Sequence, residues 1–539
     1  MVGLRTWPVD ALTKVFKDDP PGPSGEVEIE SARNGFVNGQ IAIRCEDDLE
    51  LSSSCSSVQH GESGQRLQCM PRFVGYVHVR ESVRDTPEEE ILRPAPGEFP
   101  DYLMPENRID VKAQRTQPLW LTIFVPQSSP PGDYRGSIAI KAGGEEIQAG
   151  IKLRVHQAAI PSRRTLHITN WLKPEPIAKF AGVEPWGEEH WRLLRAHAQS
   201  LSKHRQDTIL TPLNLIGVRR IGGELHLDFS VFDRFIQTFR NAGVDGLIEG
   251  GHLAGRGDDW RSGFRLRSWQ IDEGGRPIRQ PALPVESDQC EGFISEFMPA
   301  LQEHLEEKGW LECYVQHLAD EPVDENADSY RHLAELVRVY APRIRRIDAN
   351  QTKSITGCLE VWVPVLDRFD KNMGFYGDRK RGGEDVWFYT CLGPRGRYPN
   401  RFIDFSLLKV RVLHWINFRY GLSGYLHWGY NYWTEDPFRD TQPDWSNNQP
   451  LPAGDMCLVY PGDDGPIESL RYEAMRDGIQ DFELLKLLSG KDPERAEGIC
   501  GRMVKSPTDY ETDVAVFRSG ISGLLNDLDS EIGVESLRQ

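Results

Sequence analysis

Short runs in which apolar and polar residues alternate fill the N-terminal part of the chain. Between residues 26 and 155 they include E-V-E-I-E, P-L-W-L-T-I-F-V-P, G-D-Y-R-G-S-I-A-I-K and A-G-I-K-L-R-V, and Gly and Pro separate them. Short alternating runs with turn residues between them are typical of antiparallel strands packed in a sandwich. We therefore expect an N-terminal β-sandwich over residues 1–162, in which the more polar residues 46–115 form long loops.

The pattern changes after residue 162, where amphipathic helices begin to alternate with short apolar strands. Helical periodicity covers residues 191–204, 232–242, 293–308, 330–340 and 407–420, and an apolar run follows each of them. Repeated helix-then-strand order implies parallel strands with right-handed crossovers, and about 250 residues is the usual extent of a closed eight-stranded barrel. We expect a (β/α)8 TIM-like barrel over residues 163–468.

Two further patterns refine this architecture. The chain contains neither G-x-G-x-x-G nor G-x-x-x-x-G-K-[ST], which disfavours an open nucleotide-binding sheet. Residues 469–539 are helical in pattern, so we expect a C-terminal helical segment that completes the barrel or packs on it. Asp477 and Gly478 near the middle of its first helix predict a break there.

Charge and cysteine usage exclude several classes of partner. The formal net charge of -18 argues against a surface that binds nucleic acid or anionic membranes. The nine cysteines are scattered without a C-x-x-C pair or zinc spacing, so we expect no metal and no cofactor. Pro8 and Asp10 interrupt any apolar signal region, which predicts a cytoplasmic protein for the chain as written and a secreted one if a signal peptide was removed.

Two adjacent acids follow a predicted barrel strand. The run L-E-C-Y-V-Q-H-L-A-D-E-P covers residues 311–322, and we expect its strand to span residues 311–319. Asp320 and Glu321 would then lie at the C-terminal edge of the barrel, where enzymes of this architecture place their chemistry. Asp324 and Glu325 follow closely, so a solvated acidic loop is the alternative interpretation.

Aromatic and polar residues occur near other predicted strand ends. Aromatic rings pack on the apolar face of a sugar, while acids and amides hold its hydroxyl groups, so this combination favours a carbohydrate ligand. Trp428 is the expected ring platform, and Arg205 could hold a hydroxyl or form a helix-terminal salt bridge. Taken alone, each aromatic residue belongs to the core more often than to a sugar platform, and their grouping at one rim favours the platform. His252 could be a satisfied histidine near the rim. The candidate binding residues are Arg205, His252, Trp362, Tyr389, Trp428 and Tyr430.

The adjacency of the two acids constrains the mechanism. The usual retaining glycosidase needs an acid and a nucleophile that face each other across the sugar about 5–5.5 Å apart, and the usual inverting one needs two carboxyl groups about 6.5–9.5 Å apart. Neighbouring side chains instead diverge from one edge of the strand. Neighbouring acids suit a different division of labour, in which one protonates the leaving oxygen and the other orients a 2-acetamido group of the substrate that attacks the anomeric carbon. Repulsion between them would separate their pKa values and keep one protonated near neutral pH.

These residues resemble glycoside hydrolase family 123, the β-N-acetylgalactosaminidases. The similar stretches are A-R-N-G-F-V-N-G-Q at 32–40, although Gly35 replaces a more usual acid, Q-P-L-W-L-T-I-F-V-P-Q-S-S-P-P-G-D-Y-R-G at 117–136, A-D-E-P at 319–322, V-W-F-Y-T-C at 386–391, Y-P-N at 398–400, G-Y-L-H-W-G-Y-N-Y-W at 424–433 and S-L-R-Y-E-A-M-R-D-G-I-Q-D-F-E at 469–483.

The resemblance implies a retaining enzyme that releases β-linked N-acetylgalactosamine (GalNAc) from a glycan or glycoconjugate. By this resemblance Asp320 would orient the acetamido group, and Glu321 would be the general acid and then the base that opens an oxazolinium intermediate. Tyr389 is the expected hydrogen-bond partner of the acetamido oxygen.

Other functions stay open at the level of sequence. The enzyme could act on a β-linked N-acetylglucosamine (GlcNAc), or on a sugar without the acetamido group, with Glu249 or Asp348 as nucleophile. A non-catalytic glycan-binding protein is a further alternative. Metal catalysis through His317, Asp320, Asp324 and Glu325 is disfavoured because the loop lacks the spacing of an EF-hand. The sequence does not distinguish end-trimming from internal cleavage, and it does not fix the oligomeric state.

Overall fold

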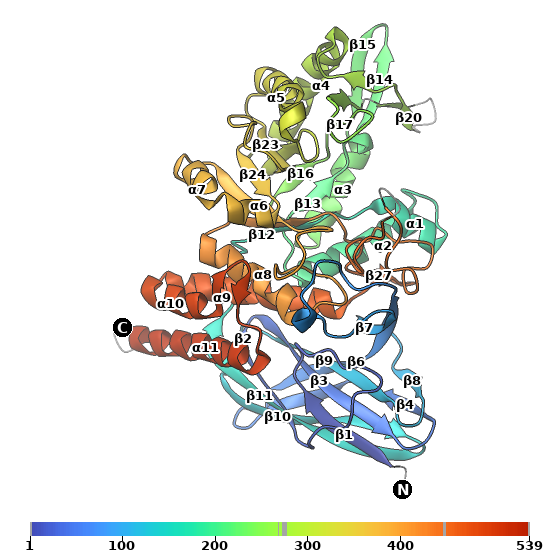
Figure 1. Ribbon diagram of the computed structural model, residues 1–539, viewed down its shortest axis with the longest axis vertical. Coiled ribbons are helices and arrows are strands. Elements are labelled where there is room, and N and C mark those ends of the chain that lie inside the picture. The colour runs from blue at the N-terminus through green and yellow to red at the C-terminus, as the bar shows by residue number, and fades with distance from the viewer. Residues whose placement is uncertain (1–2, 268, 272–276, 446–448, 537–539) are drawn as a thin grey trace. The chain divides into compact units, whose positions relative to one another are not determined.

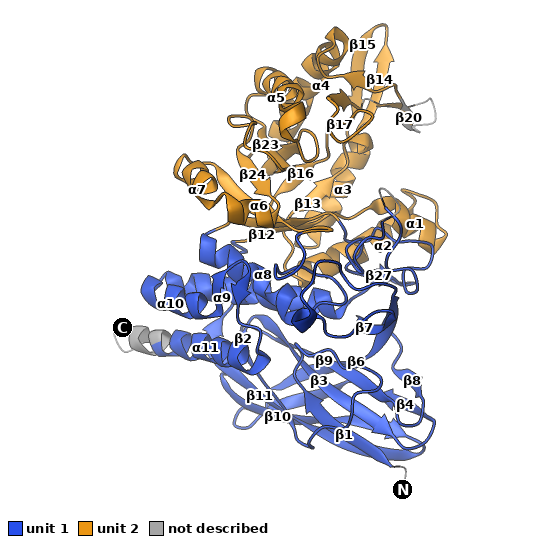
Figure 2. Cartoon of the chain, viewed as in Figure 1, with its two compact units in different colours: residues 1–165, 394–421, 429–539 blue, residues 166–393, 422–428 orange. Residues whose placement is uncertain are grey.

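The structure is a computed structural model that describes residues 3–267, 269–271, 277–445 and 449–536. It divides into two compact units (Figure 2). Unit 1 comprises residues 1–165, 394–421 and 429–539, and unit 2 comprises residues 166–393 and 422–428. The three-part division of the chain at residues 162 and 468 stays a prediction.

Unit 1 contains an eleven-stranded sheet whose strands are mostly antiparallel (Figure 1). Side chains that alternate along these strands enclose one apolar core, which includes Ile41, Leu121 and Ile138. The prediction of a mostly-strand N-terminal part is confirmed. The strands are β1 (Leu4–Val9), β2 (Val27–Arg33), β3 (Gly35–Cys45), β4 (Leu49–Ser53), β5 (Ser56–His60), β6 (Arg66–Val79), β7 (Gly97–Leu103), β8 (Arg108–Val111), β9 (Thr116–Val125), β10 (Gly132–Ala142) and β11 (Glu145–Ala159).

The expectation of long loops over residues 46–115 is wrong, because β4 to β8 lie in this stretch. Strand β6 shows why the sequence was misleading. Leu67, Cys69 and Phe73 are buried in the core, whereas Arg66 and Gln68 are exposed. The polar residues occupy the outer face of the sheet, so their abundance does not indicate irregular backbone.

Unit 1 also contains the C-terminal helices. They are α8 (Leu407–Tyr420), α9 (Leu470–Ser489), α10 (Pro493–Met503) and α11 (Val514–Ser536), and the short hairpins β27 (Tyr460–Pro461) with β28 (Pro466–Ile467) and β29 (Val504–Ser506) with β30 (Asp509–Tyr510) accompany them. In the part of the chain that the structure describes, no helix is both long enough and apolar enough to cross a membrane.

The predicted break at Asp477–Gly478 is wrong, because α9 is continuous through both residues. A Cβ atom at residue 478 would lie 2.4 Å from the carbonyl oxygen of Arg411 in α8. The glycine therefore serves close packing of two helix backbones, even though glycine costs about 1 kcal/mol relative to alanine inside a helix.

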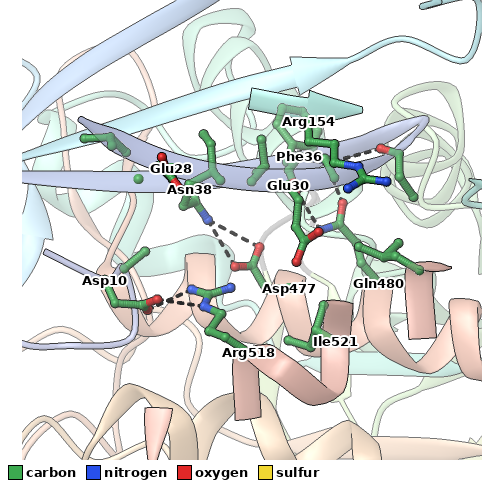
Figure 3. A pocket seen from close by; sticks show the side chains of 18 of the residues that line it. Asp10, Glu28, Glu30, Phe36, Asn38, Arg154, Asp477, Gln480, Arg518 and Ile521 are labelled. Atoms are coloured by element: carbon green, nitrogen blue, oxygen red, sulfur yellow. Dashed lines mark hydrogen bonds and ion pairs between the residues drawn. The ribbon is translucent and has the colours of Figure 1, made fainter. Parts of the chain in front are cut away.

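A cavity of about 590 Å³ lies in unit 1, lined by residues of β2, β3, α9 and α11 (Figure 3). Its wall is held by internal bonds. Asn38 Nδ2 donates to Asp477 Oδ1 over 3.3 Å, and Arg518 Nε pairs with Asp10 Oδ2 at 2.8 Å. The side-chain amide of Gln480 bonds to the backbone of Phe36. None of the predicted site residues lines this cavity.

Unit 2 is built on eight parallel strands in the order β12-β26-β25-β24-β23-β22-β16-β13. From β13 to β26, strands that follow one another in this set are neighbours in the sheet. The N-terminal strand β12 pairs with the C-terminal strand β26, so the sheet curls into a nearly closed barrel. Between β12 and β13 the backbone-to-backbone link is a hydrogen bond from Thr208 N to Ile168 O, 3.2 Å long. The strands are β12 (His167–Asn170), β13 (Ile209–Thr211), β16 (Ile248–Gly250), β22 (Tyr314–His317), β23 (Arg345–Asn350), β24 (Val361–Pro364), β25 (Asp385–Tyr389) and β26 (Gly424–His427).

The remaining elements of unit 2 lie in the connections between these strands. The helices are α1 (Pro174–Ala181), α2 (Glu188–Lys203), α3 (Ser230–Asn241), α4 (Asp288–Glu307), α5 (Ala327–Tyr340), α6 (Leu366–Lys371) and α7 (Met373–Arg381). The hairpin β14 (Gly217–Ile221) and β15 (Glu224–Asp228) follows β13, and β17 (Ala254–Arg256), β18 (Phe264–Leu266), β19 (Trp269–Ile271), β20 (Pro277–Arg279) and β21 (Leu283–Pro284) follow β16. The strand expected over residues 311–319 is shorter, because residues 311–313 form a 3-10 turn.

A buried ion pair joins β7 to α9 in unit 1. Arg471 Nε and Nη2 pair with the two carboxylate oxygens of Asp101 at 2.8 Å, and both side chains have no exposed surface. The hydroxyl of Tyr460 donates to Asp101 Oδ2 over 2.6 Å. The Arg471 guanidinium holds the pKa of Asp101 below its usual range against the opposing effect of burial.

Replacing Arg471 with methionine should destabilise unit 1 by about 3–5 kcal/mol, because it leaves the Asp101 charge buried and uncompensated. Urea unfolding followed by hydrogen exchange at the amides of α9 would measure the loss. The control is Arg135→Met, since Arg135 pairs with Glu26 at 3.6 Å while its side chain stays 64% exposed. That variant should unfold like the wild type, and a loss below about 1 kcal/mol in Arg471→Met would contradict the expectation.

Candidate active site

Asp320 and Glu321 lie just beyond β22, at the edge of the barrel where the parallel strands end. The backbone N–H of Glu321 donates to the carbonyl of Ala349 in the neighbouring β23 over 3.1 Å. Glu321 has φ +46°, in the left-handed region that costs a non-glycine residue of order 1–3 kcal/mol. This conformation interrupts the alternation of an extended strand, which would point neighbouring side chains to opposite faces.

Arg256 in β17 contacts both residues of the acidic pair. Its Nη2 donates to the carbonyl oxygen of Glu321 over 2.6 Å, and its Nη1 lies 3.9 Å from Asp320 Oδ2. The Arg256 Cζ atom lies 3.5 Å from the centroid of the Trp260 ring, a cation–π arrangement. One guanidinium therefore reaches both neighbouring acids and fixes the turn between them.

The carboxylate of Glu321 is held by two further side chains. The hydroxyl of Tyr389 in β25 donates to Glu321 Oε1, and Gln351 Nε2 donates to the same oxygen over 3.2 Å. Gln351 Nε2 also lies 3.2 Å from the Tyr389 hydroxyl, so the three groups form a triangle. Burial and the adjacent Asp320 carboxylate raise the pKa of Glu321 to about 7, against the opposing effect of these hydrogen bonds.

Asp320 differs from Glu321 in its surroundings. Its side chain is 48% exposed, so water reaches the carboxylate from one side. Enclosure by the site raises the pKa of Asp320, and the charge of Arg256 opposes this rise. Since Arg256 and solvent both favour the charged form, Asp320 is the carboxylate of the pair while Glu321 holds its proton up to about pH 7.

A buried charged network lies beneath the pair. His317 Nδ1 bonds to Asp348 Oδ1 at 2.8 Å, and His317 Nε2 bonds to Glu249 Oε1 at 3.1 Å. Burial alone would lower the pKa of His317, but its hydrogen bonds to these two carboxylates raise it to about 9. An imidazolium between two carboxylates is thus the resting state, with every member buried.

Asp348 also fixes the backbone that leads into the acidic pair. Its Oδ2 accepts hydrogen bonds from the backbone N–H groups of Leu318 and Ala319 at 2.9 and 3.0 Å and from the Tyr330 hydroxyl at 2.5 Å. Glu249 Oε2 accepts from the hydroxyl of Thr169 at 2.6 Å. Because Asp348 and Glu249 are buried and engaged in these bonds, the geometry does not support either as a nucleophile.

His252 lies beside this network, as the sequence placed it near the rim. Its Nε2 is 3.6 Å from Asp348 Oδ1, and its ring centroid is 4.8 Å from that of His317. Burial and the neighbouring His317 lower the pKa of His252 to about 3, so its ring is neutral. The Trp171 ring packs edge-on against both histidines at 5.4 Å.

Most potential metal ligands in this region are engaged in internal bonds. His252, His317 and Asp348 each offer one donor atom within 4.8 Å of the others. Both ring nitrogens of His317 already bond to carboxylates, whereas His252 Nε2 lies 3.6 Å from Asp348 Oδ1. Asp324 accepts from Ser354 at 2.8 Å, and Glu325 pairs with Arg261 at 3.2 Å.

Two of the sequence-predicted binding residues, Trp362 and Arg205, are not brought to the acidic pair. Trp362 is buried, donates from Nε1 to Glu384 at 2.7 Å and packs against Phe375 of α7. Arg205 precedes β13 and so lies at the opposite, N-terminal end of the parallel strands. Tyr430 belongs to unit 1, where it is buried.

Trp428 and Tyr389 occupy the expected edge. Trp428 directly follows β26 and is half-buried, and Tyr389 is the last residue of the neighbouring β25. The sequence analysis missed Arg256 and Gln351. Gln351 directly follows β23, so its strand-end position was a usable signal. Arg256 lies in a three-residue strand within A-G-R-G-D-D, which carries no periodic pattern.

Comparison with protein families identifies this arrangement. A model of the glycoside hydrolase 123 catalytic domain matches residues 171–488, and a model of the glycoside hydrolase 123 N-terminal domain matches residues 23–142. The chain belongs to glycoside hydrolase family 123. The family 123 resemblance stated from the sequence is thereby confirmed, and the chain is a glycoside hydrolase whose substrate is a glycan.

Solved structures agree with the family 123 assignment. The chain is similar to a family 123 glycoside hydrolase from Clostridium perfringens that was analysed for glycolipid glycan hydrolysis, with 17% identity, a TM-score of 0.76 and coverage of 99% of this chain and 98% of that chain. At this identity the likeness shows the fold. No curated protein sequence matches the chain.

Two other solved glycosidases are more distant. A termite-gut xylanase of family 10 with an Ig-like domain has 12% identity, a TM-score of 0.32 and coverage of 68% of this chain and 90% of that chain. A β-D-glucuronidase from Dictyoglomus thermophilum has 8% identity, a TM-score of 0.34 and coverage of 83% and 68%.

Asp348→Asn should lower kcat by about 10²-fold on any aryl β-glycoside that the wild-type enzyme cleaves, with a smaller change in KM. The neutral amide is a weaker acceptor for the backbone N–H groups of Leu318 and Ala319, and it removes the negative charge that faces His317. The acidic pair should therefore shift, and displacements of catalytic groups by about 1 Å lower rates by this amount. Steady-state kinetics would measure this. The control is Asp328→Asn, whose side chain is 92% exposed. Wild-type turnover in Asp348→Asn would show that Asp348 does not position the pair.

Proposed function

We propose that the chain is a retaining glycoside hydrolase that releases β-linked GalNAc by substrate-assisted catalysis. The observation that supports this most directly is the shared grip of Arg256 on two adjacent acids, of which Glu321 has a pKa raised to about 7. Two further carboxylates in the same region, Glu249 and Asp348, are buried and bonded to His317. A nucleophile supplied by the substrate accounts for this arrangement better than one supplied by the protein.

In the first step, the Asp320 carboxylate accepts a hydrogen bond from the N–H of the 2-acetamido group and turns its carbonyl oxygen toward the anomeric carbon. A bond forms between that oxygen and the anomeric carbon as the glycosidic C–O bond breaks. The leaving oxygen takes the proton of Glu321. The product is an oxazolinium ion whose positive charge lies beside Asp320.

In the second step, the Glu321 carboxylate takes a proton from a water molecule that attacks the anomeric carbon. The bond to the acetamido oxygen breaks, and the sugar leaves with its original β configuration because two inversions have occurred. Glu321 ends protonated and is ready for another cycle. We propose that Tyr389, whose hydroxyl bonds to Glu321 in the free site, turns to the acetamido oxygen when the substrate binds.

Trp428 and His252 complete the proposed sugar site. Trp428 follows β26 at the same edge and is the proposed platform for the sugar ring. His252 is neutral and lies against the network below the pair, where it can accept or donate one hydrogen bond. We also infer that the N-terminal strands form a β-sandwich and that the parallel strands form a (β/α)8 barrel of the TIM type.

The 2-acetamido group should decide the rate. We expect hydrolysis of 4-nitrophenyl β-GalNAc at a rate at least 10²-fold above that of 4-nitrophenyl β-galactoside, because the galactoside lacks the attacking oxygen. The GlcNAc and glucose glycosides form the second pair and determine which configuration is preferred. Similar rates on the acetamido and hydroxy members of both pairs would exclude substrate assistance and favour the alternative of a non-acetamido sugar.

Two substitutions test the assigned roles on the same substrate. Glu321→Gln should lower kcat/KM by about 10²–10⁴-fold, since general acid catalysis contributes that much. Asp320→Asn should be similarly impaired. The matched control is Glu325→Gln, which changes an acid of the same loop that pairs with Arg261. Glycan binding without any turnover in the wild-type protein would instead support the non-catalytic alternative.

The alkaline limb of the pH profile of kcat/KM should follow the loss of the proton from Glu321. Wild-type kcat/KM is expected to fall above about pH 7, as the acid loses its proton. Tyr389→Phe removes a hydrogen bond that lowers the pKa of Glu321, so it should move the limb to higher pH. Asp320→Asn removes a negative charge that raises this pKa, so its residual activity should move the limb to lower pH. Shifts in the same direction would contradict the assignment of Glu321 as the acid.

A further inference from the structure

The segment that follows β16 is built directly onto the catalytic strand. Leu253 N donates to the carbonyl of His317 over 3.2 Å, and Ala254 N donates to that of Leu318 over 2.9 Å. Ala254 also forms a parallel bridge with Ala319, the residue before the acidic pair. The residues that lead into β17 therefore run beside the end of β22 and the residues that follow it, although the sequence gives no sign of this pairing.

Arg267 follows β18, the strand next to β17 on the side away from β22. Strand β18 pairs antiparallel with β17, and Arg267 N, just beyond it, donates to Leu253 O over 3.1 Å. Its side chain folds back across β17. A Cβ atom at Gly255 would lie 2.2 Å from Arg267 Nη2 and 2.4 Å from its Cζ, so the absence of a side chain at Gly255 leaves the space that the guanidinium occupies.

The guanidinium of Arg267 lies against Gly255, the residue before Arg256. Its positive charge contributes to lowering the pKa of Asp320 and of His252, which agrees with a position next to Arg256. Arg256 lies between β17 and the acidic pair and contacts both acids. Arg267 is thus a second cation on the segment that carries Arg256.

Arg267 differs from the other arginines of this segment. Arg256 bonds to Glu321, Arg261 pairs with Glu325 at 3.2 Å, and Arg265 Nη1 donates to the carbonyl of Ala282 at 3.5 Å. The Arg267 side chain is exposed, and within the described ranges no residue accepts a hydrogen bond from its guanidinium. Its backbone is held in place while its five N–H donors remain available to a ligand.

We propose that Arg267 forms a subsite for an anionic substituent, a carboxylate or a sulfate ester, on the glycan bound at Asp320 and Glu321. This inference rests on the proposed function of that pair. A guanidinium binds a carboxylate or sulfate through two parallel hydrogen bonds, and such charge-assisted bonds are about twice as strong as neutral ones. A chain of net charge -18 repels an anionic glycan, so recognition of one requires a local cation at the site.

Trp260 lies between β17 and β18 and is a second candidate for the proposed subsite. Its ring is 48% exposed although the Arg256 guanidinium lies against it, and it follows β17 by four residues. An exposed aromatic ring suits the apolar face of a sugar. Trp260 and Arg267 together would hold a sugar unit and its charged group beside the reacting one.

Matched pairs of substrates test the inference. One pair is 4-methylumbelliferyl β-GalNAc with and without a 6-sulfate, which places the charge on the released sugar. The other is β-GalNAc linked to glucuronate or to glucose, which places the charge on the leaving sugar. We expect the wild-type kcat/KM for the charged member of one pair to exceed that for its neutral partner about tenfold or more, and the pair that responds identifies the source of the charge.

Three variants assign the preference to Arg267. Arg267→Gln should lower the charged-to-neutral ratio of kcat/KM about 10- to 100-fold, since hydrogen bonds to charged groups have that effect. Gly255→Ala should lower it as well, because its Cβ displaces the guanidinium without removing the charge. Arg265→Gln, the neighbouring exposed arginine on β18, should keep the wild-type ratio. A ratio near one in the wild type, or a ratio unaffected by Arg267→Gln, would overturn the subsite.

A binding measurement separates failure of the subsite from failure of the proposed function. Glu321→Gln should bind the charged member of the responding pair more tightly than the neutral one in calorimetry, whether or not the wild type cleaves either. Equal affinities would overturn the subsite even if β-GalNAc is hydrolysed. A charge preference in binding without hydrolysis of any β-GalNAc substrate would retain the subsite and reject the proposed reaction.

Discussion

The carboxylate of Asp348 ties the end of β22 to its neighbour, and the active site depends on this interaction. One oxygen binds His317, and the other binds the backbone of Leu318 and Ala319 together with Tyr330. A buried charge of this kind is stable only when every lone pair has a donor. The same bonds that satisfy Asp348 also set the direction in which the chain leaves the barrel, so charge burial and placement of the acids have one cause.

The acidic pair then acquires its asymmetry from its surroundings. Asp320 and Glu321 have similar chemistry, but one faces solvent and Arg256, whereas the other is enclosed by Tyr389 and Gln351. Two carboxylates this close cannot both be charged at low cost, so the environment decides which of them keeps a proton. The strained backbone at Glu321 is the price of bringing two successive side chains to one site.

The sequence predicted the features that depend on direction along the chain. Apolar runs located β22 to β26, and strand polarity placed Asp320, Glu321 and Tyr389 at one edge. Orientation around a strand was harder to predict. Strands of a parallel barrel are buried on both faces, so period alone does not say whether Trp362 points inward or toward the helices. Arg205 was misjudged because it precedes its strand and so belongs to the other end of the barrel.

Short elements set another limit to prediction. Strand β12 has four residues and β17 and β18 have three, which is too few for an alternating pattern to emerge. Arg256 and Arg267 are positioned by hydrogen bonds to residues more than fifty positions away in the chain or by a neighbouring glycine, and neither relationship leaves a local signal. The parts of the site that came from long-range backbone pairing were therefore visible only in three dimensions.

The incomplete ladder between β12 and β13 gives the barrel a seam. A hydrogen bond from Thr208 links the two strands there, whereas β22 has a paired strand on each side. Side chains complete the junction, because Asp207 Oδ1 and Gln206 Oε1 accept hydrogen bonds from the backbone N–H groups of Ile168 and Asn170 at 2.9 and 3.0 Å. Polar backbone groups that lack a strand partner are thereby satisfied, and the barrel closes without a full row of main-chain bonds. Trp171 follows β12 directly and packs against His252 and His317, so the same closure also fixes one wall of the buried network under the acids.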